Sequence, residues 1–181
     1  MKKIFIGLCM AFIPIGMMAQ LTEFGSFKII NTEIIYQKVS GYDSVTTEKL
    51  VEFLKTVPNI ANVEVVNNIV QADLTDFVVD YKKFQFNQVA VPPIIQTGRF
   101  SAKISMEGRD NKYRVTLKSI QVKGDIGYKK ILSPENLTNY ACTNSGTVLS
   151  RDWCKPNTLG LLDLALTDRF LFKEQKKDGD W

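Results

Sequence analysis

The chain has 181 residues, a formal net charge of +4, 45% hydrophobic residues and no histidine. Without an imidazole it cannot form a Ser-His-Asp or Cys-His catalytic pair, a histidine general base or an HExxH zinc site. The length fits one domain, and a hydrophobic fraction this high beside 23% charged residues argues against wholesale disorder.

The first residues have the pattern of a secretory signal peptide. Lys2 and Lys3 precede an apolar stretch over 4–15, and Ala19 offers a small residue for cleavage. We therefore expect residues 1–19 to be removed after Ala19 and the protein to be exported to the periplasm or the extracellular space. A bulky leucine before Cys9 disfavours a lipoprotein site. The apolar stretch is too short for a membrane span, so none is expected after cleavage.

Cleavage would remove two lysines and no acidic residue, so the mature chain is nearly balanced in charge. Two cysteines, Cys142 and Cys154, would remain, both in the turn-rich segment 124–158. In an oxidising compartment such a pair favours a disulfide that closes this long loop, with two free structural thiols as the alternative.

The mature chain begins with segment 20–27, which has no clear periodicity and is predicted to be a tether. Segment 28–39 is rich in isoleucine and tyrosine and predicts a first strand. Asp43 and Ser44 supply helix-capping chemistry, and the apolar residues of 50–57 recur at helical spacing up to Pro58. This stripe predicts a helix that packs on a sheet.

Segments 60–66 and 69–81 predict two strands joined by a tight turn at Asn67 and Asn68. Part of the second segment, 73–81, also fits helical spacing. A helix would gather three carboxylates on one face and suggest a calcium site, whereas a strand would separate them; the dense apolar run at 77–79 favours the strand. The carboxylates are those of Asp73, Asp76 and Asp80.

Segment 82–98 contains Pro92 and Pro93 and predicts a long loop or an excursion at the sheet edge. The clearest pattern follows it, because apolar and polar residues alternate strictly over 99–107 and again over 112–118. This predicts a hairpin with one buried and one solvated face. The alternation changes phase at Ser119 and Ile120, which predicts a β-bulge.

After Asn157 and Thr158 as a cap, leucine spacing predicts a C-terminal helix over 159–173 that packs on the same domain, followed by a charged, frayed tail at 174–181. The predicted fold class is α+β: a curved antiparallel sheet of about five strands, with a helix packed on one face and a C-terminal helix. The domain proper is expected to span 28–123.

Several motifs carry a family resemblance, centred on Gly98-Arg99-Phe100, Lys103-Ile104 and the run from Arg109 to Thr116, with minor support from Asp80-Tyr81. With the order of predicted elements, they make the segment from about Ile29 to Val122 resemble a family of secreted proteins of gut-type Gram-negative bacteria. That family is a domain of unknown function with a TATA-box-binding-protein-like (TBP-like) fold. The resemblance implies a curved antiparallel sheet with a helix on one face, and it brings no catalytic residues and no DNA binding.

The solvated face of the predicted hairpin is basic, and a polyanion could bind there. Its cations include Arg99, Lys103, Arg114 and Lys118. Because no aromatic residue alternates with these cations, nucleic acid is not an expected partner, and a merely solvated face is the simpler interpretation.

The sequence predicts no catalytic residue, no metal site and no cofactor. We therefore expect an exported, non-catalytic binding or structural module of the cell envelope, which recognises a glycan, lipid, peptide or protein through the open sheet face or the long loops. One alternative is a histidine-free hydrolase of glycans with a carboxylate pair, Asp76 with Asp80 or Glu107 with Asp110. A second alternative is a polyanion binder that uses the basic hairpin face.

Overall fold

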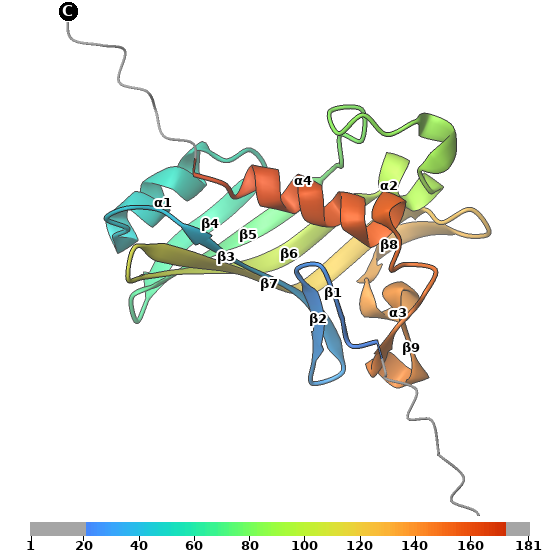
Figure 1. The fold of residues 1–181 in the computed structure, drawn as a ribbon, viewed down its shortest axis with the longest axis horizontal. Coiled ribbons are helices and arrows are strands. Elements are labelled where there is room, and N and C mark those ends of the chain that lie inside the picture. The colour runs from blue at the N-terminus through green and yellow to red at the C-terminus, as the bar shows by residue number, and fades with distance from the viewer. Residues whose placement is uncertain (1–20, 173–181) are drawn as a thin grey trace, which may run out of the picture.

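A computed structural model describes residues 21–172, so the predicted signal peptide and the predicted tail at 174–181 lie outside the described residues. The described chain forms an eight-stranded antiparallel sheet in the order β1-β2-β3-β7-β6-β5-β4, and β8 also pairs with β7. Figure 1 shows this sheet as a curved layer with α1, α2 and α4 on one side of it. The α+β class is confirmed, and the sheet has more strands than the five expected.

The strands of the sheet are β1 (Glu23–Phe24), β2 (Phe27–Ile30), β3 (Glu33–Gly41), β4 (Ile60–Val66), β5 (Ile69–Phe77), β6 (Arg99–Arg109), β7 (Lys112–Asp125) and β8 (Lys130–Asn136). A separate ladder joins β9 (Cys142–Thr143) and β10 (Val148–Leu149). The helices are α1 (Thr47–Thr56), α2 (Pro93–Thr97), α3 (Thr138–Ala141) and α4 (Leu161–Arg169), with single turns at η1 (Gln88–Ala90), η2 (Asn144–Gly146) and η3 (Pro156–Gly160).

The N-terminal part of the prediction was wrong in two places. The expected tether contains β1 and the start of β2, where Phe27 is fully buried. The expected single strand 28–39 is a hairpin of β2 and β3, whose turn places Asn31 and Thr32 at φ of 50° and 61°. Asparagine tolerates this left-handed conformation, but a β-branched threonine rarely adopts it. The residue types of segment 28–39 therefore indicated a continuous strand and not a turn.

The first helix follows the prediction closely. Helix α1 buries Leu50 and Leu54 completely against the sheet, as their spacing indicates. Its cap differs from the expected Asp43-Ser44, because the hydroxyl of Thr46 accepts the Lys49 N–H at 3.3 Å. The cap therefore lies two residues beyond Ser44.

The ambiguous segment 73–81 is a strand as far as Phe77 and irregular beyond it. The turn at Asn67 and Asn68 is confirmed, with φ of 51° and 61° in the hairpin of β4 and β5. Asp76 lies in a bulge of β5 with φ of 46°. Segment 82–98, expected as a loop, contains η1 and the short helix α2, whose Ile94 and Ile95 are buried in the core.

The hairpin of β6 and β7 and its bulge are confirmed. The pairing shifts between Ser101 and Lys103, and opposite this shift Ser119 has φ of 50°. The carboxylate of Glu33 accepts the Ser119 N–H at 2.6 Å. The bulge divides the outer edge of β7: residues 112–117 pair with β3, and residues 121–125 pair with β8. One long strand therefore supports two partners on the same side.

Segment 124–158 is not the long loop that was expected. It contains the end of β7, strand β8, α3 and the ladder of β9 and β10, and its Leu137, Ala141 and Leu149 are buried. The predicted disulfide is absent, since Cys142 and Cys154 are both free thiols of intermediate burial. Backbone hydrogen bonds close the segment instead, from Leu149 N to the Leu21 carbonyl at 2.7 Å and from Ser150 N to the Ala141 carbonyl at 2.8 Å.

Helix α4 is shorter than the predicted 159–173 and begins after the η3 turn. It lies across the sheet in Figure 1, and its Leu162 and Leu166 are buried there. Polar contacts fix its position: the Asp163 carboxylate accepts the Ser26 N–H at 3.0 Å, and the Tyr36 hydroxyl contacts the Thr167 hydroxyl at 3.1 Å. No helix within residues 21–172 is long and apolar enough to cross a membrane.

Candidate functional site

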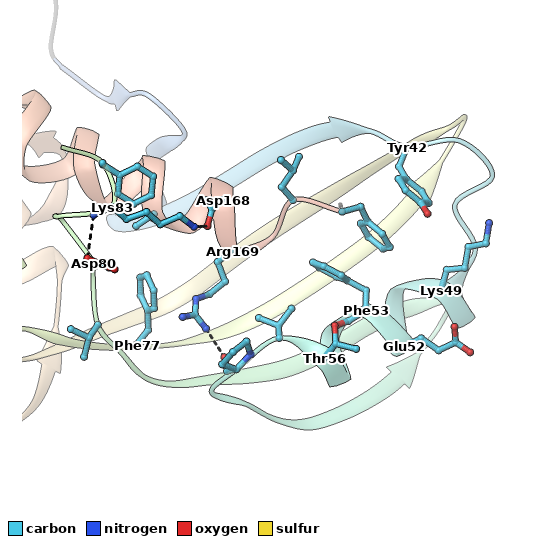
Figure 2. Close-up of a pocket in the computed structure, with 17 residues that line it drawn as sticks. Tyr42, Lys49, Glu52, Phe53, Thr56, Phe77, Asp80, Lys83, Asp168 and Arg169 are labelled. Carbon is cyan, nitrogen blue, oxygen red and sulfur yellow. Dashed lines mark hydrogen bonds and ion pairs between the residues drawn. The ribbon is translucent and has the colours of Figure 1, made fainter. Parts of the chain in front are cut away.

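A groove of about 1010 Å³ lies between α1 and the C-terminal end of α4. Segment 77–84, which follows β5, completes its wall. We call it the α1–α4 groove. Figure 2 shows its side chains converging from α1 on one side and from α4 and segment 77–84 on the other. It therefore lies on the helix-covered side of the sheet, not on the open face that the sequence singled out.

Aromatic rings form one wall of the groove. Phe53 of α1 stacks on Phe172 with ring centroids 4.2 Å apart, and Tyr42 packs on Phe172 from another side at 4.4 Å. The buried Tyr113 fixes this arrangement, because its hydroxyl donates to the Phe170 carbonyl at 2.9 Å and accepts the Phe172 N–H at 3.2 Å. The chain after α4 is thereby held against α1, and the wall is built into the fold.

Arg169 lies in the middle of the groove, in the last turn of α4 (Figure 2). Its Nη1 donates to the Pro58 carbonyl at 2.5 Å, and its guanidinium carbon is 4.5 Å from the centre of the Phe77 ring. Burial lowers the pKa of Arg169, and the charge of Asp168 works in the opposite direction. The guanidinium thus joins the end of α4 to both the end of α1 and the end of β5.

Three other charged residues of the groove, Lys83, Asp80 and Asp168, are engaged with one another. Lys83 forms an ion pair with Asp168 at 2.5 Å, and the Asp80 carboxylate accepts the Lys83 backbone N–H at 3.3 Å. These contacts connect segment 77–84 to α4. Asp80 is the one member of the predicted acidic trio that lines the groove.

The predicted basic residues do lie together on neighbouring strands β6 and β7, all exposed. Two of them form ion pairs with carboxylates: Lys103 pairs with Asp73 at 2.7 Å and Arg114 pairs with Glu107 at 2.5 Å. The hydrogen bond from Lys103 also lowers the pKa of Asp73. Within residues 21–172 the other two, Arg99 and Lys118, form no ion pair. Much of the predicted positive patch is therefore compensated.

The predicted carboxylate pairs are separated or engaged. Asp76 pairs with Lys123 at 2.8 Å, a contact that lowers the pKa of Asp76, so this carboxyl is a poor proton donor. Asp76 does not line the groove that holds Asp80. Glu107 pairs with Arg114, and Asp110 pairs with the neighbouring Arg109 at 3.1 Å. In the part of the chain that the structure describes, no three cysteine, aspartate or glutamate side chains form a group that could hold a metal ion.

Sequence reasoning missed the residues that matter most in the groove. Phe53 belongs to the stripe predicted to pack on the sheet, but only its neighbours Leu50 and Leu54 are fully buried. Arg169 and Phe172 lie at the end of a predicted helix, where charged and aromatic residues do not by themselves indicate a binding site. The run Arg169-Phe170-Leu171-Phe172 is the one signal, since it places aromatic rings just beyond the last helical turn.

The geometry defines an α+β protein with an eight-stranded antiparallel sheet and an aromatic groove on its helix-covered face. A comparison with protein-family models gives no match, and a comparison with curated proteins gives none either. Two solved structures are similar to the chain. One is a DUF4468 family protein from Bacteroides ovatus, with a TM-score of 0.43 and 10% sequence identity over 80% of this chain and 83% of that one.

The other solved structure is a TBP-like protein from Parabacteroides distasonis, with a TM-score of 0.43 and 12% identity over 78% of this chain and 93% of that one. The first is described as a member of a domain-of-unknown-function family and the second as a TBP-like protein. Neither names a ligand or an activity, so the question of function rests on the residues of this chain.

Proposed function

We propose that the protein is an exported, non-catalytic binding module of the cell envelope and that its ligand occupies the α1–α4 groove. The observation that carries this proposal is the aromatic wall of Phe53, Phe172 and Tyr42, which polar contacts of the fold hold beside an open hollow. Preformed, mostly apolar concavities with a few convergent polar groups are typical ligand sites.

Exposed apolar side chains at the rim support the same conclusion. Val78 and Leu171 both line the groove, and they are 44% and 43% exposed. A single exposed apolar residue needs no explanation, but two that border an aromatic hollow extend the apolar surface offered to a ligand. The export half of the proposal rests on the leader pattern of residues 1–19.

The proposal is tested with a neutral hydrophobic fluorophore, N-phenyl-naphthylamine, titrated into the mature protein. We expect saturable binding that Val78→Lys weakens about tenfold, the loss expected when a partly buried valine contact becomes a charge. Val89→Lys is the matched control, because Val89 is 94% exposed and does not line the groove. Equal binding by the two variants, or no saturable binding by the wild type, would refute a groove site.

Export is tested separately by expressing the full chain and sequencing the N-terminus of the protein recovered outside the cytoplasm. We expect it to begin at Gln20. Protein that stays in the cytoplasm with residues 1–19 attached would contradict the envelope location and leave the groove result intact.

A further inference from the structure

Arg169 is a half-buried cation with unused hydrogen-bonding capacity. A guanidinium carries five N–H donors in a planar fork. Among residues 21–172, its hydrogen-bond acceptor is the Pro58 carbonyl, and no carboxylate lies within 4.0 Å of it. Most of its donors are therefore available to another group.

The charge of Arg169 is also poorly compensated. Burial lowers its pKa, which reflects the cost of holding a cation away from water. Asp168 opposes this effect at a distance, but the Asp168 carboxylate is in contact with Lys83 at 2.5 Å. An anion that entered the groove would offset this cost and meet the free side of the fork, which matches carboxylate geometry.

Part of the surroundings of Arg169 is apolar. The ring of Phe77 lies against the guanidinium at 4.5 Å, and the stacked rings of Phe53 and Phe172 form the opposite wall in the direction of α1. An anion bound to Arg169 would therefore be attached to an apolar body. A small inorganic anion would make no use of this apolar wall.

Sugars fit this wall less well than an aliphatic chain does. A sugar needs a free ring face and nearby hydroxyl partners, but Phe172 is covered by Phe53 and Tyr42, and the Phe77 ring is covered by Arg169. The Thr56 hydroxyl is already bonded to the Phe53 carbonyl at 2.7 Å. The aromatic wall thus offers apolar contact and no free ring face.

An extended peptide also fits poorly. Peptides that bind in extended form need a row of backbone N–H and C=O groups, which an exposed strand edge supplies. Two walls of this groove are the helices α1 and α4, whose backbone groups are bonded within each helix. Side chains, and not the backbone, therefore make most of the contacts on offer.

We propose that the α1–α4 groove binds a lipid carboxylate, with the guanidinium of Arg169 holding the carboxylate and the phenylalanine rings holding the acyl chain. This inference rests on the proposed function, because it names the ligand class of the same groove. It assigns to Arg169 the role of the residue that selects an anion over a neutral lipid.

The test compares dodecanoate with methyl dodecanoate as competitors for the bound neutral fluorophore. Wild-type protein should bind dodecanoate about ten- to a hundredfold more tightly, the range expected for hydrogen bonds to a charged group. Arg169→Met keeps an apolar stem on Phe77 and should reduce this ratio to near one. Arg151→Met, at an exposed position outside the groove, is the matched control and should keep the ratio.

A second series lengthens the chain from octanoate to decanoate and dodecanoate. If the added methylenes are buried, affinity should rise about tenfold per two carbons. No gain with length would overturn the acyl assignment, and equal affinity for acid and ester would overturn the role of Arg169. Arg169→Lys keeps the charge without the fork and provides a folded comparison, with a preference between those of the wild type and Arg169→Met.

These experiments distinguish a failure of the carboxylate preference from a failure of the groove site itself. Fluorophore binding that the acid and the ester displace equally would leave the groove site standing and remove the carboxylate preference. Absence of fluorophore binding would remove both. A lower melting temperature for Arg169→Met with an unchanged acid-to-ester ratio would show that Arg169 has only a structural role, and would overturn the inference.

Discussion

Tyr113→Phe removes one oxygen atom and tests how the groove wall is held. The Tyr113 side chain is buried, and its hydroxyl makes two hydrogen bonds to the chain that leaves α4, at Phe170 and Phe172. A hydrogen bond contributes about 1 kcal/mol net, and a buried acceptor left without a donor costs about 1–3 kcal/mol more. Phe170 is itself buried, so its carbonyl would gain little from water.

We therefore expect Tyr113→Phe to lower the free energy of unfolding by about 3 kcal/mol. For a domain of this size that corresponds to a fall in melting temperature of about 6–12 °C. Urea denaturation measures the change, with an unaltered slope confirming that both states keep their exposed surface. Tyr128→Phe is the matched control, because Tyr128 is 86% exposed and should change stability by less than about 0.5 kcal/mol. Equal stability of the two variants would refute the reasoning.

Two further predictions concern other parts of the fold. Gly25 has φ of +60°, and a Cβ added there would lie 2.3 Å from the Asp163 carboxylate. Gly25→Ala should therefore lower the free energy of unfolding by about 2–3 kcal/mol, because it strains the backbone and displaces the Asp163 carboxylate from its hydrogen bond with the Ser26 N–H. Gly41→Ala is its control, with nothing within 4 Å of the added Cβ; similar losses in both would contradict the account. Burial raises the pKa of the Cys142 thiol from 9.0 to about 11, so iodoacetamide should label native Cys142 slowly at pH 8 and rapidly in urea. Because the folded state binds this proton more tightly, the thiol's contribution to stability should decline as pH rises from about 9 to 11; fast native labelling, or a urea-resistant disulfide, would refute the assignment.

The elements that the local sequence pattern predicts correctly are those with one buried face and one solvated face. The alternation over β6 and β7 determines which side chains enter the core, and Ile104 and Val115 are buried as predicted. The phase change at Ser119 marks the bulge because an extra residue must shift the side-chain parity. These predictions need no knowledge of distant parts of the chain.

The parts that sequence reasoning missed depend on distant contacts. Segment 130–136 contains Ser133 and Pro134, which suggest a turn, but it becomes strand β8 because β3 pairs only with the first half of β7 and leaves the outer edge of the far half open. Residues 23–30 become strands because β3 offers an edge to β2 and the core accepts Phe27. In both cases the segment forms a strand because a strand edge is available for pairing, and not because of its local propensity.

The candidate site was unpredictable for the same reason. Pro58, Phe77 and Arg169 come from the end of α1, the end of β5 and the end of α4, and each looks ordinary in its own segment. Only the course of α4 across the sheet brings them together. The sequence identifies the aromatic and basic residues but contains no pattern that joins them.

Charge compensation distinguishes the two faces of the sheet and indicates where a ligand gains most. On the open face, Lys103 and Arg114 each have a carboxylate within 2.7 Å and are exposed to water, where surface ion pairs contribute little and an added anion would compete with the resident one. In the groove, Arg169 is half buried with no carboxylate in contact among the described residues, so an anion there would replace missing solvation and not an existing partner. The same attraction is worth more where water is excluded. The exposed basic patch is the more conspicuous feature of the sequence, but the single arginine in the aromatic groove has the stronger physical basis for binding an anion.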